Sequence, residues 1–387
     1  MIAYHTTRLK KVFARQQAAQ YFEEGCITRE ELTGVSNKHP DTFYSPNFFI
    51  RIGLFTLTVV ILLFSLGLIA LLFLNSIEDA AGGLAIFFAL LSYAALEFMV
   101  KEKNHFQSGV DDALLWIFAG AFFGGISYIS KADGLTNSVL VLAIATYCSL
   151  RFADRLMSGM AYLSLLATFF FCCIKIGPGI KAFLPFVIMA VSATIYFLEK
   201  YFRKNITSHL HLDCLQVVST LSLITFYLAG NYYVVRELRN ALFYVVDPAN
   251  TAPVPFGWMF WIFTIAIPCI YLARGIQKKD IVLIRVGLLL VAAIVFTIRQ
   301  YYSVAAIETV MTFGGIVLII VAYGSTRYLK TPKHGFVNVQ RTSTEENEKV
   351  NLESLLVAQT LATSSSSVEG VNFGGGNFGG GGASADF

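Results

Sequence analysis

The stretch IGLFTLTVVILLFSLGLIALLFL, residues 52–74, contains no charged side chain and no proline. A helix needs about 20 apolar residues to cross a bilayer, and this stretch exceeds that length. The first 49 residues of the chain are polar and mixed, which is unlike the start of a cleaved signal peptide. We therefore expect the stretch to stay in the protein as a signal anchor and to be its first membrane span.

Apolar runs of similar length recur along the chain. The protein has 387 residues, of which 56% are hydrophobic and 14% are charged, whereas soluble domains carry about 25% charged residues. Helices are the expected form of these runs, because lipid offers no partner to open backbone groups and the runs lack the alternation of barrel strands. We predict ten spans, at about 52–74, 80–100, 113–130, 136–150, 156–174, 180–198, 214–235, 254–273, 281–298 and 302–323.

The basic residues predict the orientation of these spans. If the N-terminus is cytoplasmic, 23 of the 29 lysines and arginines fall on the inner side and 6 on the outer side. This asymmetry agrees with the tendency of cytoplasmic loops to carry the positive charge. If one helix had been missed, every later loop would be assigned to the wrong side of the membrane. The 23 to 6 distribution therefore also supports the number of spans. Both termini are expected to be cytoplasmic.

Together these patterns predict an all-α polytopic membrane protein with about ten transmembrane helices. We divide the chain into a cytoplasmic helical hairpin at 1–49 and a transmembrane bundle at 50–325. A cytoplasmic segment with a short amphipathic helix follows at 326–362, and a disordered Ser/Gly-rich tail at 363–387.

The N-terminal segment has the signals of two short helices with a tight joint. Gly25 stands where a left-handed helix stop is expected, and Thr28 with Glu31 forms a capping box for the next helix. The pattern Gly-x-Ile-Thr-x-x-Glu in 25–31 resembles the joint of short bacterial helical hairpins. It also resembles the N-terminal region of a family of predicted bacterial multi-pass inner-membrane proteins of unknown function. The resemblance implies a small packing or interaction module; the simpler interpretation is a well-capped hairpin.

The chain closes on VNFGGGNFGGGGASADF, residues 371–387. Glycine loses much entropy on ordering, so we expect this tail to be disordered and cytoplasmic. The stretch GGGNFGGGGASADF resembles the glycine-rich ends of bacterial membrane-anchored envelope proteins, although Asp386 and Phe387 depart from that pattern. The resemblance implies cell-envelope surroundings and no reaction. The tail is either a spacer or a tether whose three phenylalanines dock on a partner; these are Phe373, Phe378 and Phe387.

An acidic residue inside a span is the first candidate for a functional group, because its burial in lipid is costly. Glu308 lies six residues into the tenth predicted span, about 9 Å deep at the rise of an α-helix. Arg299 at the outer end of the ninth span is its natural partner. The pair is either an ion or proton site or a structural tie between two helices.

Other charged and aromatic side chains have structural interpretations. Glu97 stands four residues before Lys101, which suits a pair on a helix surface. Asp111 and Asp112 begin a span, where the helix dipole favours acids. The pattern WMFWIF, with Trp258 and Trp261, is typical of an aromatic belt.

No pattern in the chain predicts a catalytic residue, a cofactor or a metal site. The stretch HLHLD, residues 209–213, could suggest a metal, but His209 and His211 would point about 200° apart on a helix. Phosphate-loop and dinucleotide motifs are absent, as are the spacings of a zinc site among the six cysteines. Nucleic acid is not an expected partner; the lipid bilayer is, with a protein partner for the hairpin or the tail.

Two classes of function fit these observations. The first is a non-enzymatic, envelope-associated scaffold or interaction protein of the bacterial inner membrane. The second is a secondary transporter or exporter of a small or amphipathic solute, with Glu308 and Arg299 near the path. A polar cavity within the bundle would favour transport, and a dry core would favour the scaffold.

Overall fold

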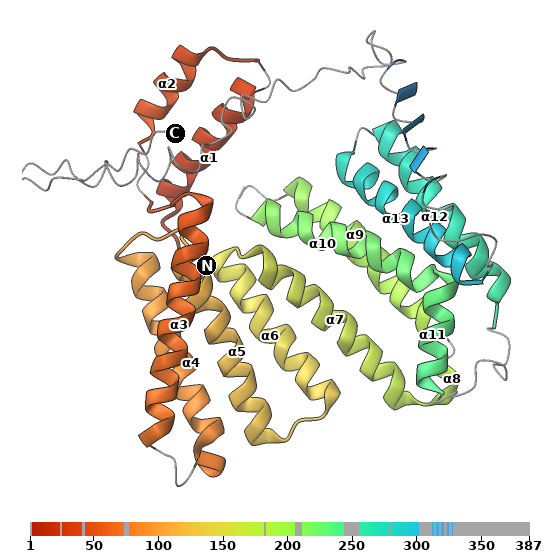
Figure 1. Ribbon diagram of the computed structural model, residues 1–387, viewed down its shortest axis with the longest axis horizontal. Coiled ribbons are helices and arrows are strands. Elements are labelled where there is room, and N and C mark those ends of the chain that lie inside the picture. Colours follow the sequence, from red (N-terminus) through yellow and green to blue (C-terminus); the bar gives the residue numbers. More distant parts are fainter. Residues whose placement is uncertain are drawn as a thin grey trace, which may run out of the picture.

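The structure, a computed structural model, describes residues 2–23, 25–40, 43–72, 77–181, 183–205, 211–243, 255–278 and 280–301, with scattered residues from 312 to 327. Helices joined by short connections make up these ranges, and no strand occurs among the described residues (Figure 1). The helices are α1 (Thr6–Glu23), α2 (Arg29–Lys38), α3 (Phe48–Leu72), α4 (Ile77–Lys101), α5 (Val110–Ser130), α6 (Gly134–Phe152), α7 (Arg155–Ile176), α8 (Pro178–Lys181), α9 (Leu184–Asn205), α10 (Leu212–Gly230), α11 (Tyr232–Leu242), α12 (Gly257–Lys278) and α13 (Ile281–Tyr301).

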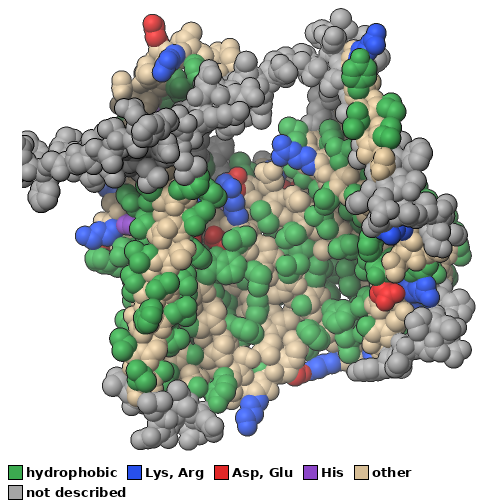
Figure 2. Space-filling model, viewed as in Figure 1, with side chains coloured by type: hydrophobic (Ala, Val, Ile, Leu, Met, Phe, Trp, Pro, Cys, Tyr) green, Lys and Arg blue, Asp and Glu red, His purple; other side chains and the backbone are tan. Residues whose placement is uncertain are grey.

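Nine of the described helices are long and apolar enough to cross a membrane, which confirms the all-α polytopic class. They are α3, α4, α5, α6, α7, α9, α10, α12 and α13, and they correspond in order to the first nine predicted spans. In Figure 2 hydrophobic side chains cover the middle of the visible face, and most charged side chains lie toward its upper and lower ends. Most of the tenth predicted span, 302–323, lies outside the described residues.

Consecutive helices pack side by side and alternate in direction (Figure 1). One buried apolar cluster joins the start of the chain to α4, α5, α6 and α7, and a second joins α9, α10, α12 and α13. Contact between α7 and α10 connects these two halves.

We call the end of the bundle where α3, α5 and α7 begin the hairpin face, because α1 and α2 lie there. The sequence predicts this face to be cytoplasmic.

The joint between α1 and α2 has the predicted chemistry. Gly25 has a φ of +72°, and the N–H of Cys26 donates to the carbonyl of Tyr21, which satisfies the end of α1. The N–H of Glu31 donates to the Thr28 hydroxyl, and the N–H of Thr28 donates to the Glu31 carboxylate at 2.8 Å. The capping box is therefore confirmed.

Two predicted spans have different bounds in the structure. The sixth was expected to begin at residue 180, but Pro178–Lys181 forms the separate turn α8 and the membrane helix begins at Leu184. The seventh was expected to reach residue 235, but α10 ends at Gly230. Asn231 ends it because its side chain caps the new helix α11, accepting from the N–H groups of Tyr233 and Val234.

Candidate functional site

The chain between α4 and α5 is held in an unusual turn at the hairpin face. Asn104, Gln107 and Gly109 have φ values of 54°, 50° and 91°, which lie in the left-handed region. Gly109 lies against α3 so closely that an added Cβ would be 2.2 Å from the carbonyl oxygen of Arg51. Glycine is therefore required both by the backbone angle and by the available space.

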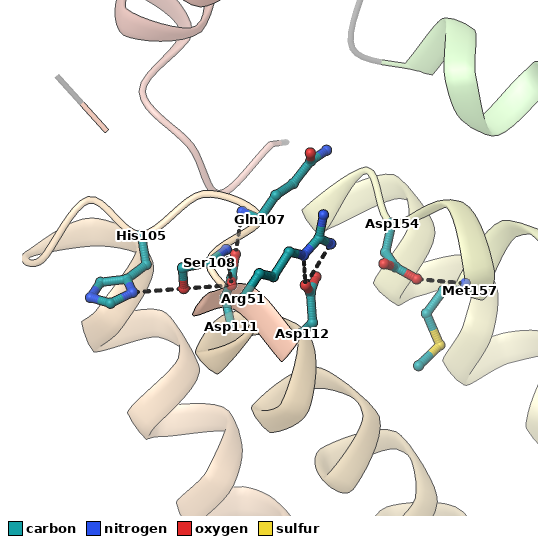
Figure 3. Close-up of polar contacts among 8 residues, drawn as sticks. All are labelled: Arg51, His105, Gln107, Ser108, Asp111, Asp112, Asp154 and Met157. Atoms are coloured by element: carbon teal, nitrogen blue, oxygen red, sulfur yellow. Dashed lines mark hydrogen bonds and ion pairs between the residues drawn. The ribbon is translucent and has the colours of Figure 1, made fainter. Parts of the chain in front are cut away.

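The carboxylate of Asp111 stabilises this turn through hydrogen bonds. It is 4% exposed and accepts from the N–H of Gln107 at 2.8 Å and from the N–H and hydroxyl of Ser108 at 2.9 Å each (Figure 3). Nδ1 of His105 lies 2.8 Å from the same hydroxyl. Burial lowers the pKa of His105, and the nearby Asp111 partly opposes this shift. Asp111 thus serves the turn rather than only the helix dipole.

Asp112 faces the neighbouring helix. The Arg51 side chain of α3 donates from Nε and Nη2 to one carboxylate oxygen of Asp112, at 3.0 and 2.6 Å (Figure 3). Charged donors and acceptors form stronger hydrogen bonds than neutral ones, so this pair ties the start of α5 to α3. Sequence patterns placed Asp111 and Asp112 at the start of a helix, which is confirmed, but did not indicate Arg51 as a partner.

Asp154 lies at the start of α7, beside this pair (Figure 3). Its carboxylate caps the helix by accepting from the N–H of Met157 at 2.7 Å. Within the described part of the chain it forms no ion pair. Burial raises the pKa of Asp154, while the helix N–H groups and the charge of Arg51 partly oppose the shift.

These groups line a cavity of about 560 Å³ at the hairpin face, which we call the hairpin-face cavity. Its polar wall contains Arg51, Asp111, Asp112, Asp154 and Arg155. Its apolar wall is largely aromatic and is formed by Tyr4, Phe48, Phe55, Phe106, Trp116 and Phe152, with several aliphatic side chains. The site is therefore amphipathic and opens where membrane helices begin.

The N-terminal segment is attached to this cavity. Tyr4 is 7% exposed, and its ring meets Phe106 edge to face with centroids 5.1 Å apart. Burial raises the pKa of Tyr4, so it stays a neutral part of the wall. The N–H of Ala3 donates to the carbonyl of Arg151, and Arg8 donates to the side chain of Asn104. The hairpin is thus coupled to the turn that forms the cavity.

The predicted pair of Glu97 and Lys101 belongs to a network of more than two side chains. Lys101 pairs with Glu97 at 2.6 Å, as the four-residue spacing predicted. Arg151 of α6 also pairs with Glu97, and the hydroxyl of Tyr93 donates to the same carboxylate at 2.9 Å. Glu97 therefore joins two helices rather than only bracing one.

Several predicted candidates cannot be placed in a site. Glu308 and the tail phenylalanines Phe373, Phe378 and Phe387 lie outside the described residues. Arg299 is exposed near the end of α13, opposite the hairpin face. Asp213 of the HLHLD stretch pairs with Arg155, and the described residues contain no group of three or more potential metal ligands.

The predicted aromatic belt surrounds the start of α12, at the end opposite the hairpin face. Trp258 is 66% exposed, and Trp261 stacks on Tyr232 with centroids 4.9 Å apart. Tyr301 meets both rings of that stack edge to face.

No protein-family model, curated protein or solved structure matches this chain.

Proposed function

We propose that this integral membrane protein is a non-enzymatic carrier that binds a small amphipathic cation in the hairpin-face cavity. The observation that carries the proposal is the Asp154 carboxylate, which lines the cavity without an ion-pair partner in the described ranges. A cavity of about 560 Å³ lies within the range of about 300–1,000 Å³ that small-molecule sites occupy.

The other charged side chains of the cavity already have hydrogen-bond or ion-pair partners within the described residues. Asp111 accepts from backbone N–H groups and a hydroxyl, and Asp112 is paired with Arg51. Arg155 forms an ion pair with Asp213 of α10. Asp111 is buried and uses both carboxylate oxygens in the turn, whereas Asp154 is half-buried and lines the cavity, so we assign the positive charge of a ligand to Asp154.

The apolar wall selects the rest of the ligand. Phe48, Phe55, Trp116 and Phe152 offer ring faces and edges to a flat apolar body, and an aromatic face also attracts a cation. A hydrophilic amine would leave this wall in contact with water. An amine joined to an aromatic or branched apolar group fits both walls.

Calorimetric titration of the purified protein with tryptamine tests this proposal. Indole-3-propionate is the control ligand, because it keeps the ring and reverses the charge. We expect tryptamine to bind and indole-3-propionate not to bind. Asp154→Asn should weaken tryptamine binding by about 10- to 100-fold, because a hydrogen bond to a charged group contributes about 1.5–3 kcal/mol.

Asp133→Asn is the matched control for that variant. Asp133 also caps a membrane helix, accepting from the N–H of Thr136 at 3.0 Å, but it lies at the opposite end of the bundle. Asparagine is as good a cap as aspartate, so neither variant should unfold its helix. Equal affinity for tryptamine and indole-3-propionate, or equal loss in both variants, would refute the proposal.

Binding should also depend on pH in a defined direction. The ligand needs the ionised carboxylate, so affinity should fall as the pH drops through the pKa of Asp154. Because burial raises that pKa, the loss should begin at a higher pH than for an exposed aspartate, whose pKa is about 3.9. A titration series in tryptamine checks this, and an affinity that stays constant down to about pH 4 would contradict it.

An envelope-associated scaffold is the second candidate, and the observation that favours it is α2. This helix has no buried residue and so presents its surface to a partner. Deleting Arg29–Lys38 would then remove co-purifying proteins while leaving tryptamine binding intact. Placement in a bacterial inner membrane with both termini cytoplasmic remains part of this proposal and rests on the distribution of basic residues.

A further inference from the structure

A second cavity, of about 280 Å³, lies between α9, α10, α12 and α13 toward the hairpin face. Three basic side chains line it: Lys200 near the end of α9, and Arg274 and Lys278 in the last turns of α12. We call this cavity the basic groove. It lies in the other half of the bundle from the hairpin-face cavity and has the opposite charge.

The cations of the groove are available to a ligand. Arg274 and Lys278 are four residues apart, so they lie on one side of α12, and both are exposed. Within the described ranges neither has an ion pair or a side-chain hydrogen bond. Lys200 lies over the ring of Tyr196 at 4.6 Å and is 3.7 Å from the carboxylate of Asp280, which is the one acid paired with these three cations in the described chain.

Below the cations the groove is apolar and open to the side of the bundle. Phe197, Phe226 and Ile270 line it together with Tyr196 and Tyr271. Phe197 is 69% exposed and Ile270 is 55% exposed, so the apolar part continues onto the surface that faces lipid. A soluble anion would use the cations and leave this wall unoccupied.

We propose that the basic groove binds an anionic phospholipid. The three cations hold its phosphate, and one acyl chain lies along Phe197 and Ile270. Basic pockets between membrane helices at the cytoplasmic side suit anionic headgroups, and each cation near the membrane surface strengthens binding by about fivefold. The α12 end also belongs to the face that the sequence predicts to be cytoplasmic.

Native mass spectrometry of the detergent-purified protein tests this assignment. The probes are phosphatidylglycerol and phosphatidylcholine with identical acyl chains, and inorganic phosphate as competitor. The wild type should bind one phosphatidylglycerol in preference to phosphatidylcholine. The triple variant Lys200→Gln, Arg274→Gln, Lys278→Gln should bind it about 100-fold more weakly, because three contributions of about fivefold are lost.

Two further variants separate a built site from general charge effects. Lys38→Gln, Lys103→Gln, Arg285→Gln removes the same charge from exposed cations that do not line the groove, and should bind phosphatidylglycerol as the wild type does. Asp280→Asn should bind it more tightly, because Lys200 loses its competing acid. Asparagine keeps the cap that Asp280 provides to the N–H groups of Val282 and Leu283.

Three results would overturn the proposal. One is equal binding of the two phospholipids by the wild type. Another is an equal loss in the groove variant and its charge-matched control. The third is full displacement of phosphatidylglycerol by inorganic phosphate at the same concentration, which would assign the groove to a soluble anion.

Discussion

Replacing Gly109 with alanine should destabilise the bundle by about 3–5 kcal/mol and detach α3 from α5. The φ of Gly109 is +91°, and alanine is strained at this backbone angle even where there is space for its side chain. The new Cβ would also lie 2.2 Å from the carbonyl oxygen of Arg51 and 3.0 Å from the backbone nitrogen of Phe55. Both are backbone atoms of a helix and cannot move aside singly.

Thermal unfolding in detergent, followed by circular dichroism, measures this loss. Gly120→Ala, within the helix α5 that Gly109 precedes, is the control, because nothing lies within 4 Å of its added Cβ. Alanine there should stabilise the helix by about 0.5–1 kcal/mol. If the two variants melted at the same temperature, the close approach of Gly109 to α3 would be wrong.

Replacing Asn231 with leucine should cost about 2–3 kcal/mol. Asn231 is 2% exposed, and its Nδ2 donates to the hydroxyls of Tyr227 and Thr297 at 2.9 Å each. Its Oδ1 accepts from the N–H groups of Tyr233 and Val234. The cap of α11 contributes about 1 kcal/mol, the bond to Thr297 on another helix about 0.6 kcal/mol and the bond to Tyr227 about 1 kcal/mol, which together give the expected loss. Leucine has a similar volume, which keeps a cavity from adding to it.

The partner variant Thr297→Val shows whether the loss arises from this network. Thr297 is buried and joins α13 to Asn231. In the wild type Thr297→Val should destabilise the protein, and in the Asn231→Leu background it should cost less, because the shared bond is already gone. Additive losses in thermal melts of the two single variants and the double variant would contradict the network.

The sequence predicts the helices of this fold well, because the length of an apolar run is set by bilayer thickness. Nine runs from 52–74 to 281–298 correspond to nine membrane helices, and the joint at Gly25 and Thr28 has the expected capping. The short helix α11 was missed. Its start depends on the side chain of Asn231, whose hydrogen-bond partners lie on α10, α11 and α13, and a hydropathy window does not register such a cap.

The candidate site could not be predicted in the same way. Arg51, Asp112 and Asp154 are far apart in the chain, and each stands at a helix start where an ordinary charge pattern explains it. The turn of Gly109 and the packing of α3, α5 and α7 bring them around one cavity. One sequence feature could have indicated the site. Asp154 stands in the stretch RFADR, residues 151–155, which joins two spans by too few residues to form a solvated loop.

Uptake of a labelled cation into proteoliposomes tests the proposed carrier most directly. N,N,N-trimethyltryptammonium is the probe, because its charge is permanent and its indole ring matches the aromatic wall of the hairpin-face cavity. Liposomes containing the wild type or Asp133→Asn should take it up faster than protein-free liposomes, and Asp154→Asn should reduce uptake to the protein-free rate. Uptake by the wild type at the protein-free rate, or unchanged uptake by Asp154→Asn, would contradict the account.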